Sequence, residues 1–169
     1  PDNQSRELDD RTRMEEEMTD PKTIFETGLQ MEVEANKYYT EHAARVKHRG
    51  TQAMLLELAA EEQGHIDWFR AALEGKNIGP DKTIEAPKVD LKIGETLRDD
   101  IEITEKSEPG DVLVVAIKAE MHAIKVYGKW AEEHKGTDIE ALLTNIINEE
   151  KTHKYRLEQM YDDEYLSEN

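Results

Sequence analysis

Apolar residues recur at helical spacing along the first part of the chain. Asp20 precedes a proline, a combination typical of a helix start, and the helical pattern continues from Phe25 until Gly50. A second helical stretch begins with Thr51 as its cap and ends near Gly75. Because a short turn joins the two stretches, they predict an antiparallel helical hairpin.

The same pattern returns in the second half of the chain. It predicts a third helix from Pro109 to about His134 and a fourth from Thr137 or Asp138 to about Asp163. Residues 76–108 separate the hairpins and contain glycines and prolines, with a weakly helical stretch over residues 95–106. A connection of this length can run from one end of a bundle to the other. The pattern therefore predicts an all-α antiparallel four-helix bundle with one long crossover between the second and third helices.

The length of 169 residues suits one compact domain. Residues 1–19 carry dense charge and few apolar side chains, so they predict a loosely ordered lead. The bundle is expected over residues 20–163, with related hairpins at about 20–75 and 109–163. Residues 164–169 are expected to form a tail.

Composition narrows the possible partners. The formal net charge of −17 argues against a nucleic-acid surface, because phosphate binding needs clustered Lys and Arg. The longest purely apolar run, residues 112–117, is far shorter than the ~20 residues needed to cross a bilayer. No cysteine is present, which excludes disulfides, thiolate zinc sites and iron–sulfur clusters within this chain. We expect a cytoplasmic protein, soluble and without a membrane or nucleic-acid partner, whose metal ligands are oxygen and nitrogen.

An internal repeat relates the two hairpins. A shift of 88 residues gives 11 identities over the 34 positions from Glu32 to His65, whereas composition alone would give about two or three. Any two amphipathic hairpins share some apolar positions, which accounts for pairs such as Leu55 and Leu143. The acids and histidines in the repeat need another explanation.

These acids and histidines lie on the faces that the apolar stripes predict to be buried. Glu62 and His65 are three residues apart on the second helix, and the fourth helix repeats this spacing. Buried carboxylates are costly unless they are paired or bind a metal. A single Glu-x-x-His is often an exposed pair. Two such pairs in register, together with one inward glutamate on each of the two remaining helices, form the arrangement found in di-metal carboxylate bundles. The predicted metal ligands are Glu32, Glu62, His65, Glu120, Glu150 and His153.

Four segments carry a resemblance to a known family. They are LQMEVEANKYY and AIKAEMHAIKVY, which contain the single glutamates, and EEQGH and EEKTH, which contain the Glu-x-x-His pairs. Over about residues 22–162 the chain resembles the rubrerythrin branch of the ferritin-like superfamily. The resemblance implies a ferritin-like bundle with Glu62 and Glu150 as bridging or chelating carboxylates, and the two histidines as terminal ligands.

The resemblance also implies roles for neighbouring residues, and the chain departs from the family's pattern in two respects. Glu61 and Glu149 are expected at the surface or against a ligand. Tyr39 and Tyr127 lie seven residues after Glu32 and Glu120 and on the same helix faces. We expect each tyrosine to hydrogen-bond a ligand carboxylate, with electron relay as the alternative. The family's further glutamate on the third helix is replaced by Ala123, and a cysteine-free chain has no rubredoxin-type iron site of its own.

The leading hypothesis is a non-haem di-iron enzyme that reacts with peroxide or dioxygen, as a peroxidase or ferroxidase in oxidative-stress defence. It implies two iron ions, a separate electron donor protein and a homodimer or larger homo-oligomer. Iron storage by a ferroxidase and a dimanganese catalase-like activity are the alternatives, because oxygen and nitrogen ligands do not by themselves separate manganese from iron.

Overall fold

The computed structural model describes residues 20–76 and 82–166, and these form four long helices with no strand. They are α2 (Pro21–Ala43), α3 (Arg49–Leu73), α4 (Pro109–Glu133) and α5 (Asp138–Tyr161). A 3₁₀ turn, η1 (Ile93–Thr96), lies in the connection, and a π-helical turn, η2 (Asp162–Leu166), follows α5. The predicted all-α four-helix bundle is confirmed. The lead over residues 1–19 and the tail residues 167–169 lie outside the described residues.

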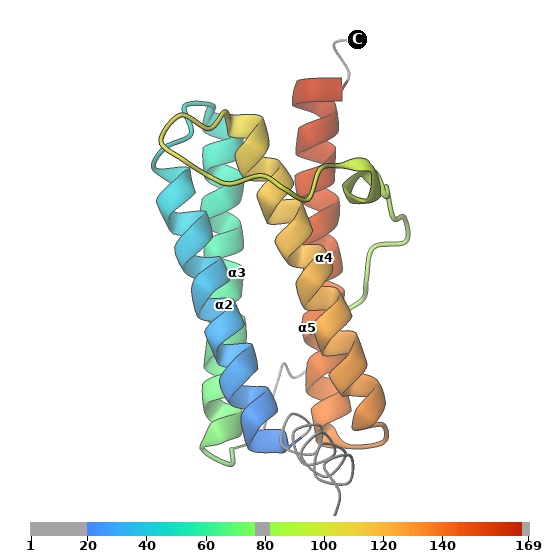
Figure 1. The fold of residues 1–169 in the computed structure, drawn as a ribbon. Helices are drawn as coiled ribbons and strands as arrows, with labels where there is room; N and C mark the ends of the chain where they lie inside the picture. The colour runs from blue at the N-terminus through green and yellow to red at the C-terminus, as the bar shows by residue number, and fades with distance from the viewer. Residues whose placement is uncertain (1–19, 77–81, 167–169) are drawn as a thin grey trace, which may run out of the picture.

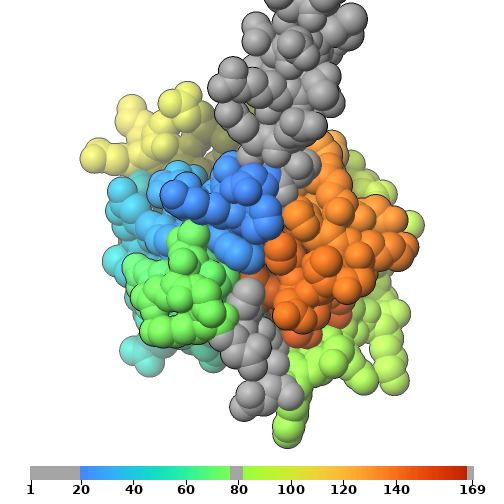
Figure 2. Space-filling model, turned by 90° about the horizontal axis from the view of Figure 1, so that it is seen from below, coloured from blue at the N-terminus to red at the C-terminus, as the bar shows by residue number. Residues whose placement is uncertain are grey.

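The helices pair as two antiparallel hairpins, α2 with α3 and α4 with α5 (Figure 1). Seen from below, the hairpins lie side by side (Figure 2). Helices α3 and α4 run in the same direction, so the chain must return along the length of the bundle between them (Figure 1). This return is the long crossover that the sequence predicted.

Two helix boundaries differ from the sequence prediction. Helix α2 ends at Ala43 instead of continuing to Gly50, and α3 begins at Arg49. The reason is the cap of α3: the ring nitrogen of His48 accepts a hydrogen bond from the backbone N–H of Thr51, so His48 and not Thr51 starts the helix.

The crossover has less helix than predicted. Beyond the 3₁₀ turn that ends at Thr96, residues 97–108 are not helical, apart from isolated turns. Long-range contacts fix its path instead. The amide of Ile84 donates to the side chain of Asn145, and the amide of Gly94 donates to Glu158 on α5. A Cβ atom on Gly94 would lie 2.6 Å from the sulfur of Met121, so only glycine lets the crossover approach α4 this closely.

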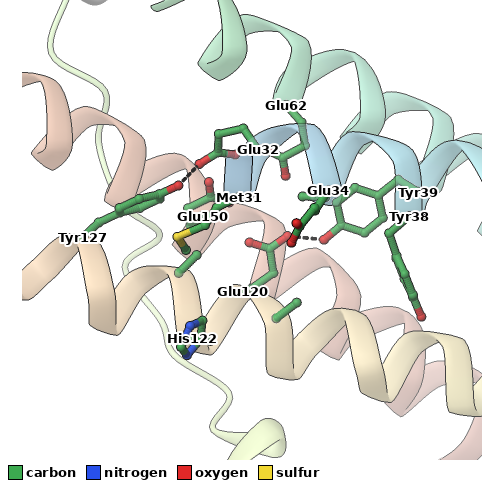
Figure 3. A pocket seen from close by; sticks show the side chains of 13 residues that line it. Met31, Glu32, Glu34, Tyr38, Tyr39, Glu62, Glu120, His122, Tyr127 and Glu150 are labelled. Carbon is green, nitrogen blue, oxygen red and sulfur yellow. Dashed lines mark hydrogen bonds between the residues drawn. The ribbon is translucent and has the colours of Figure 1, made fainter. Parts of the chain in front are cut away.

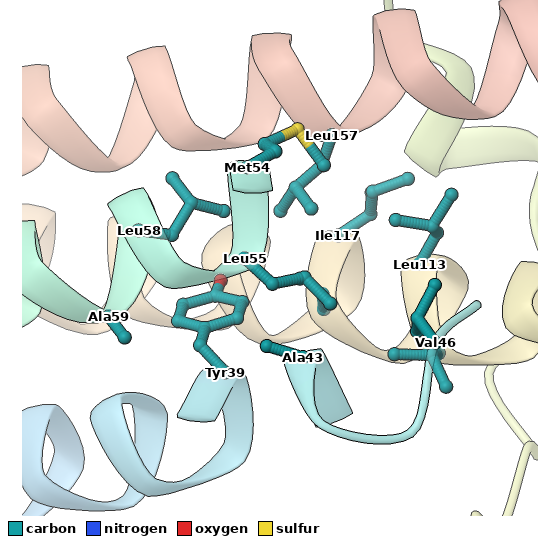
Figure 4. Close-up of a cluster of buried hydrophobic side chains, with 12 residues drawn as sticks. Tyr39, Ala43, Val46, Met54, Leu55, Leu58, Ala59, Leu113, Ile117 and Leu157 are labelled. Carbon is teal, nitrogen blue, oxygen red and sulfur yellow. The ribbon is translucent and has the colours of Figure 1, made fainter. Parts of the chain in front are cut away.

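The core consists of two clusters of buried apolar side chains. One cluster contains Leu55, Leu58 and Leu113 and fills the end of the bundle near the α2–α3 turn (Figure 4). The other contains Phe25, Phe69 and residues of the α4–α5 hairpin. Along each helix the two clusters are separated by a short segment that carries buried polar residues. The bundle therefore has a polar layer between two apolar layers.

No helix in the described part of the chain combines the length and the apolar character that crossing a bilayer requires.

Candidate metal centre

The polar layer brings together all six residues that the sequence predicted as ligands. Each helix contributes its ligands from the part of its inward-facing stripe that lies between the two apolar clusters. Each of the six side chains is at most 3% exposed. They are Glu32 from α2, Glu62 and His65 from α3, Glu120 from α4, and Glu150 and His153 from α5.

These side chains form two groups of four that overlap. In each group the potential ligand atoms lie within 4.8 Å of one another. Glu62 and Glu150 belong to both groups. The first group is completed by Glu32 and His65, and the second by Glu120 and His153. If each group held one cation, Glu62 and Glu150 could therefore contribute ligand atoms to both cations.

The Nδ1 atom of each histidine faces several carboxylates at once. Nδ1 of His65 lies 2.9 Å from Glu62, 3.1 Å from Glu150 and 3.3 Å from Glu32. Nδ1 of His153 lies 3.1 Å from Glu150, 3.2 Å from Glu62 and 3.7 Å from Glu120. A ring nitrogen carries at most one hydrogen, so it cannot satisfy three carboxylates.

The outer nitrogens of the histidines bind glutamates of the opposite hairpin. Nε2 of His65 lies 2.6 Å from Glu149, and Nε2 of His153 lies 2.9 Å from Glu61. A carboxylate on Nε2 favours a hydrogen there and leaves Nδ1 free as a donor to a metal. Glu61 and Glu149, which were expected at the surface or against a ligand, therefore contact the histidines and orient them.

The surroundings of the two histidines differ despite the repeat. Arg156 donates to Glu61, with Nη1 3.1 Å from one carboxylate oxygen. The position related to Arg156 by the 88-residue shift is Trp68, whose ring centroid lies 5.3 Å from that of His65. One histidine is thus supported by a charged network, and the other by an indole.

Two buried tyrosines also connect the hairpins. The hydroxyl of Tyr39 on α2 donates to Glu120 on α4, and that of Tyr127 on α4 donates to Glu32 on α2 (Figure 3). Both side chains are at most 1% exposed. This is the hydrogen bond to a carboxylate that the sequence predicted for them, and it fixes the two glutamates that are not shared.

The buried charges perturb one another strongly. Burial raises the pKa of Glu32 and of Glu120 well above the ordinary value, and the charge of Glu150 adds to the effect. Burial alone would raise the pKa of Glu150 too, but the charge of His65 and a hydrogen bond to His153 hold it well below the ordinary value. Without a metal, the carboxylates therefore require positive charge beside them.

The two histidines supply this charge. Burial disfavours a charged imidazole, yet the charge of Glu150 and the hydrogen bonds to Glu149 and neighbouring carboxylates hold the pKa of His65 well above its usual value. Hydrogen bonds to Glu150 and Glu61 and the charge of the nearby Glu62 outweigh burial in the same way and raise the pKa of His153. A positive charge on each imidazole offsets the charge of the surrounding carboxylates, as a bound cation would.

Two further observations support a pair of metal ions among these residues. Both carboxylate oxygens of Glu62 are buried and have no partner in hydrogen-bond geometry, although each lies within 3.2 Å of an imidazole nitrogen. Four carboxylates also match the charge of two divalent cations. Carboxylate and imidazole ligands suit iron and manganese.

A pocket of about 240 Å³ leads from the surface to the carboxylates (Figure 3). It lies between α2 and α4, and Glu32, Glu62, Glu120 and Glu150 line its inner part. Its outer part is lined mainly by small or apolar side chains, including Ala123, with the exposed Glu34 and His122 also among the lining residues. The cluster is therefore accessible to a small molecule from this side.

A helical bundle with a carboxylate and histidine cluster at its centre, in two overlapping groups, defines a ferritin-like metal-binding protein. The sequence matches the rubrerythrin family over residues 23–108 and 111–169. The chain belongs to the rubrerythrin family. Searches of curated proteins and of solved structures gave no match.

Proposed function

We propose that the protein is a non-haem di-iron oxidoreductase that reduces peroxide in oxidative-stress defence. The six ligands would be Glu32, Glu62, His65, Glu120, Glu150 and His153. The observation that supports this most strongly is the pair of four-residue groups that share Glu62 and Glu150. Glu62 and Glu150 would help to hold both ions of an iron pair, which would supply the two electrons that the reduction of a peroxide requires.

Iron bound in this cluster would supply the electrons that cleave the O–O bond. The protein's own contribution begins with the histidines, which Glu61 and Glu149 hold so that Nδ1 points to the centre. Tyr39 and Tyr127 hold Glu120 and Glu32 by hydrogen bonds. These contacts fix the ligands before a metal binds, which lowers the cost of arranging them.

The apolar layers on either side of the cluster exclude water from its flanks, while the pocket between α2 and α4 admits the oxidant. Electrons must then come from outside, because the chain has no cysteine for an iron–sulfur or rubredoxin-type centre. A separate electron donor protein is part of this proposal.

The test begins with metal analysis of protein purified anaerobically from its own host. Two iron ions per chain are expected. The reduced protein is then mixed separately with hydrogen peroxide and with air-saturated buffer, and oxidation is followed by absorbance. Faster oxidation by peroxide supports the proposal. Faster turnover with dioxygen together with mineral growth would favour an iron-storage ferroxidase, and gas evolution by a manganese-loaded protein without a donor would favour a catalase.

The ligand assignment is tested with histidine variants. His65→Ala and His153→Ala should each lower the metal content, because each removes a nitrogen ligand from one of the two groups. His122→Ala is the matched control, since this histidine lies on α4 with an exposed side chain and belongs to neither group. If both ligand variants kept two metal ions per chain, the assignment and the proposed function would fail together.

A further inference from the structure

We propose that the preferred oxidant is an organic hydroperoxide with a compact apolar group, which the pocket between α2 and α4 accommodates. This inference rests on the proposed peroxide reduction and specifies its substrate. It starts from a mismatch between the size of the pocket and the size of hydrogen peroxide.

The pocket measures about 240 Å³. A water molecule occupies about 30 Å³ of the liquid, and a dry cavity of about 150 Å³ binds benzene. Hydrogen peroxide has only two heavy atoms and would leave most of this space to solvent. The inner part of this volume, beside the four carboxylates, would be shared with the two ions, and the outer part suits an apolar group of about the size of benzene.

The chemistry of the walls has two parts. The inner end presents the carboxylates and the hydroxyl groups of Tyr39 and Tyr127. The outer part presents the side chain of Met31, the methyl groups of three alanines and the ring of Tyr38, and the exposed side chains of Glu34 and His122 also line the pocket. A hydroperoxide has the same division, with a polar O–O–H group at one end and carbon at the other. Its polar end would lie at the cluster, and its apolar group would lie against the outer walls.

The repeat places small side chains on both sides of this passage. Ala35 on α2 and Ala123 on α4 are related by the 88-residue shift, and both line the pocket. A glutamate at 123 would reach into the passage and add a charge to its wall. Alanine at both positions keeps the passage wide and apolar.

The reaction balances with the electron donor that the proposed function already includes. The O–O bond of ROOH is cleaved with two electrons and two protons, which gives the alcohol ROH and water. Iron held in the cluster would supply the electrons, solvent would supply the protons, and the proposed donor protein would restore the electrons in the next step. The alcohol retains the apolar group, so the pocket should also bind the product.

Product binding gives a test that needs no turnover. The probe is 2-phenyl-2-propanol, the alcohol formed from cumene hydroperoxide, and its binding to metal-free and to zinc-loaded protein is measured by ligand-observed NMR. Ala123→Leu narrows the passage, and each methylene-sized group that it displaces should weaken binding about fourfold. Ala53→Leu makes the same change at an exposed position on α3 outside the pocket and should leave binding unchanged.

Turnover gives the second measurement. Reduced, iron-loaded protein is mixed with cumene hydroperoxide or with hydrogen peroxide in a stopped-flow instrument, and the ratio of the two rate constants is compared. We expect a ratio above one for the wild type and for Ala53→Leu, and a lower ratio for Ala123→Leu.

The outcomes separate this inference from the proposed function. If hydrogen peroxide oxidises the protein but the alcohol does not bind and the ratio is below one, the substrate inference fails and the di-iron peroxidase stands. If the alcohol binds but iron does not, the proposed function fails, and the pocket is then a binding site for a small apolar alcohol without the redox step.

Discussion

The sharing of Glu62 between the two groups of ligands predicts a difference between two otherwise similar substitutions. Glu62→Gln alters both cation positions, whereas Glu32→Gln alters one. Glutamine keeps the shape of the side chain and removes the charge. We therefore expect Glu62→Gln to lose both metal ions and Glu32→Gln to lose one.

The magnitude follows from the number of ions bound. A ligand that binds only the folded protein at a hundred times its dissociation constant adds about 2.7 kcal/mol to the free energy of unfolding. Two ions would add about 5 kcal/mol, and for a domain of this size each kcal/mol raises the melting temperature by about 2–4 °C. Metal should thus raise the melting temperature of the wild type by about 10–20 °C, that of Glu32→Gln by about half as much, and that of Glu62→Gln very little.

The assay is a thermal melt under anaerobic conditions at neutral pH, with and without ferrous or manganous ion, together with metal analysis of the same samples. Glu41→Gln is the control, because this glutamate is exposed on α2 and its loss changes the net charge equally. The metal-free form of Glu32→Gln should melt no lower than metal-free wild type, since burial and the charge of Glu150 raise the pKa of Glu32 and make its ionised form unfavourable in the folded protein. Equal metal loss in Glu32→Gln and Glu62→Gln would refute the idea of shared ligands.

Three further changes test the contacts around the cluster. Tyr39→Phe removes the hydroxyl that donates to a buried carboxylate, so it should lower the free energy of unfolding by about 1–3 kcal/mol in urea denaturation of the metal-free protein. Glu149→Gln weakens the acceptor on Nε2 of His65 and should lower metal affinity about 10–100-fold in a chelator competition. Gly28→Ala places a methyl group in collision with the ring of Phe69 and should destabilise the protein by about 1–3 kcal/mol, measured by the midpoint of urea unfolding.

Each of these changes has an outcome that would contradict its reasoning. Unchanged stability of Tyr39→Phe would mean that its carboxylate partner has another donor. Unchanged metal affinity of Glu149→Gln would mean that packing alone orients His65. A Gly28→Ala protein as stable as the wild type would mean that the ring of Phe69 moves without cost. Gly64→Ala is the control for the last change, because a methyl group there meets nothing within 4 Å.

The sequence predicted the bundle and the convergence of the six side chains because both depend on periodicity within single helices. Inward stripes and the 88-residue shift place the acids and histidines on the correct faces without any knowledge of the neighbouring helices. The start of α3 was placed too late, because the cap at His48 depends on its side-chain conformation and not on helix propensity.

Contacts between helices were harder to predict. The repeat marked Glu61 and Glu149, but it did not reveal that each binds a histidine of the other hairpin, because this depends on the distance and rotation between α3 and α5. The path of the crossover was likewise not contained in local patterns. It is set by contacts such as that between Ile84 and Asn145, which are 61 residues apart.

The two ligand groups, which draw residues from both hairpins, bear on how such a chain arose. Neither hairpin holds a complete group, because each group needs a glutamate from the other half. An ancestral chain with one hairpin would have met this need by pairing with an identical copy, and gene duplication followed by fusion would give the present repeat. If the crossover were cut between residues 76 and 82, the apolar clusters and the Tyr–Glu hydrogen bonds would still join the two fragments, and bound metal ions would strengthen their association.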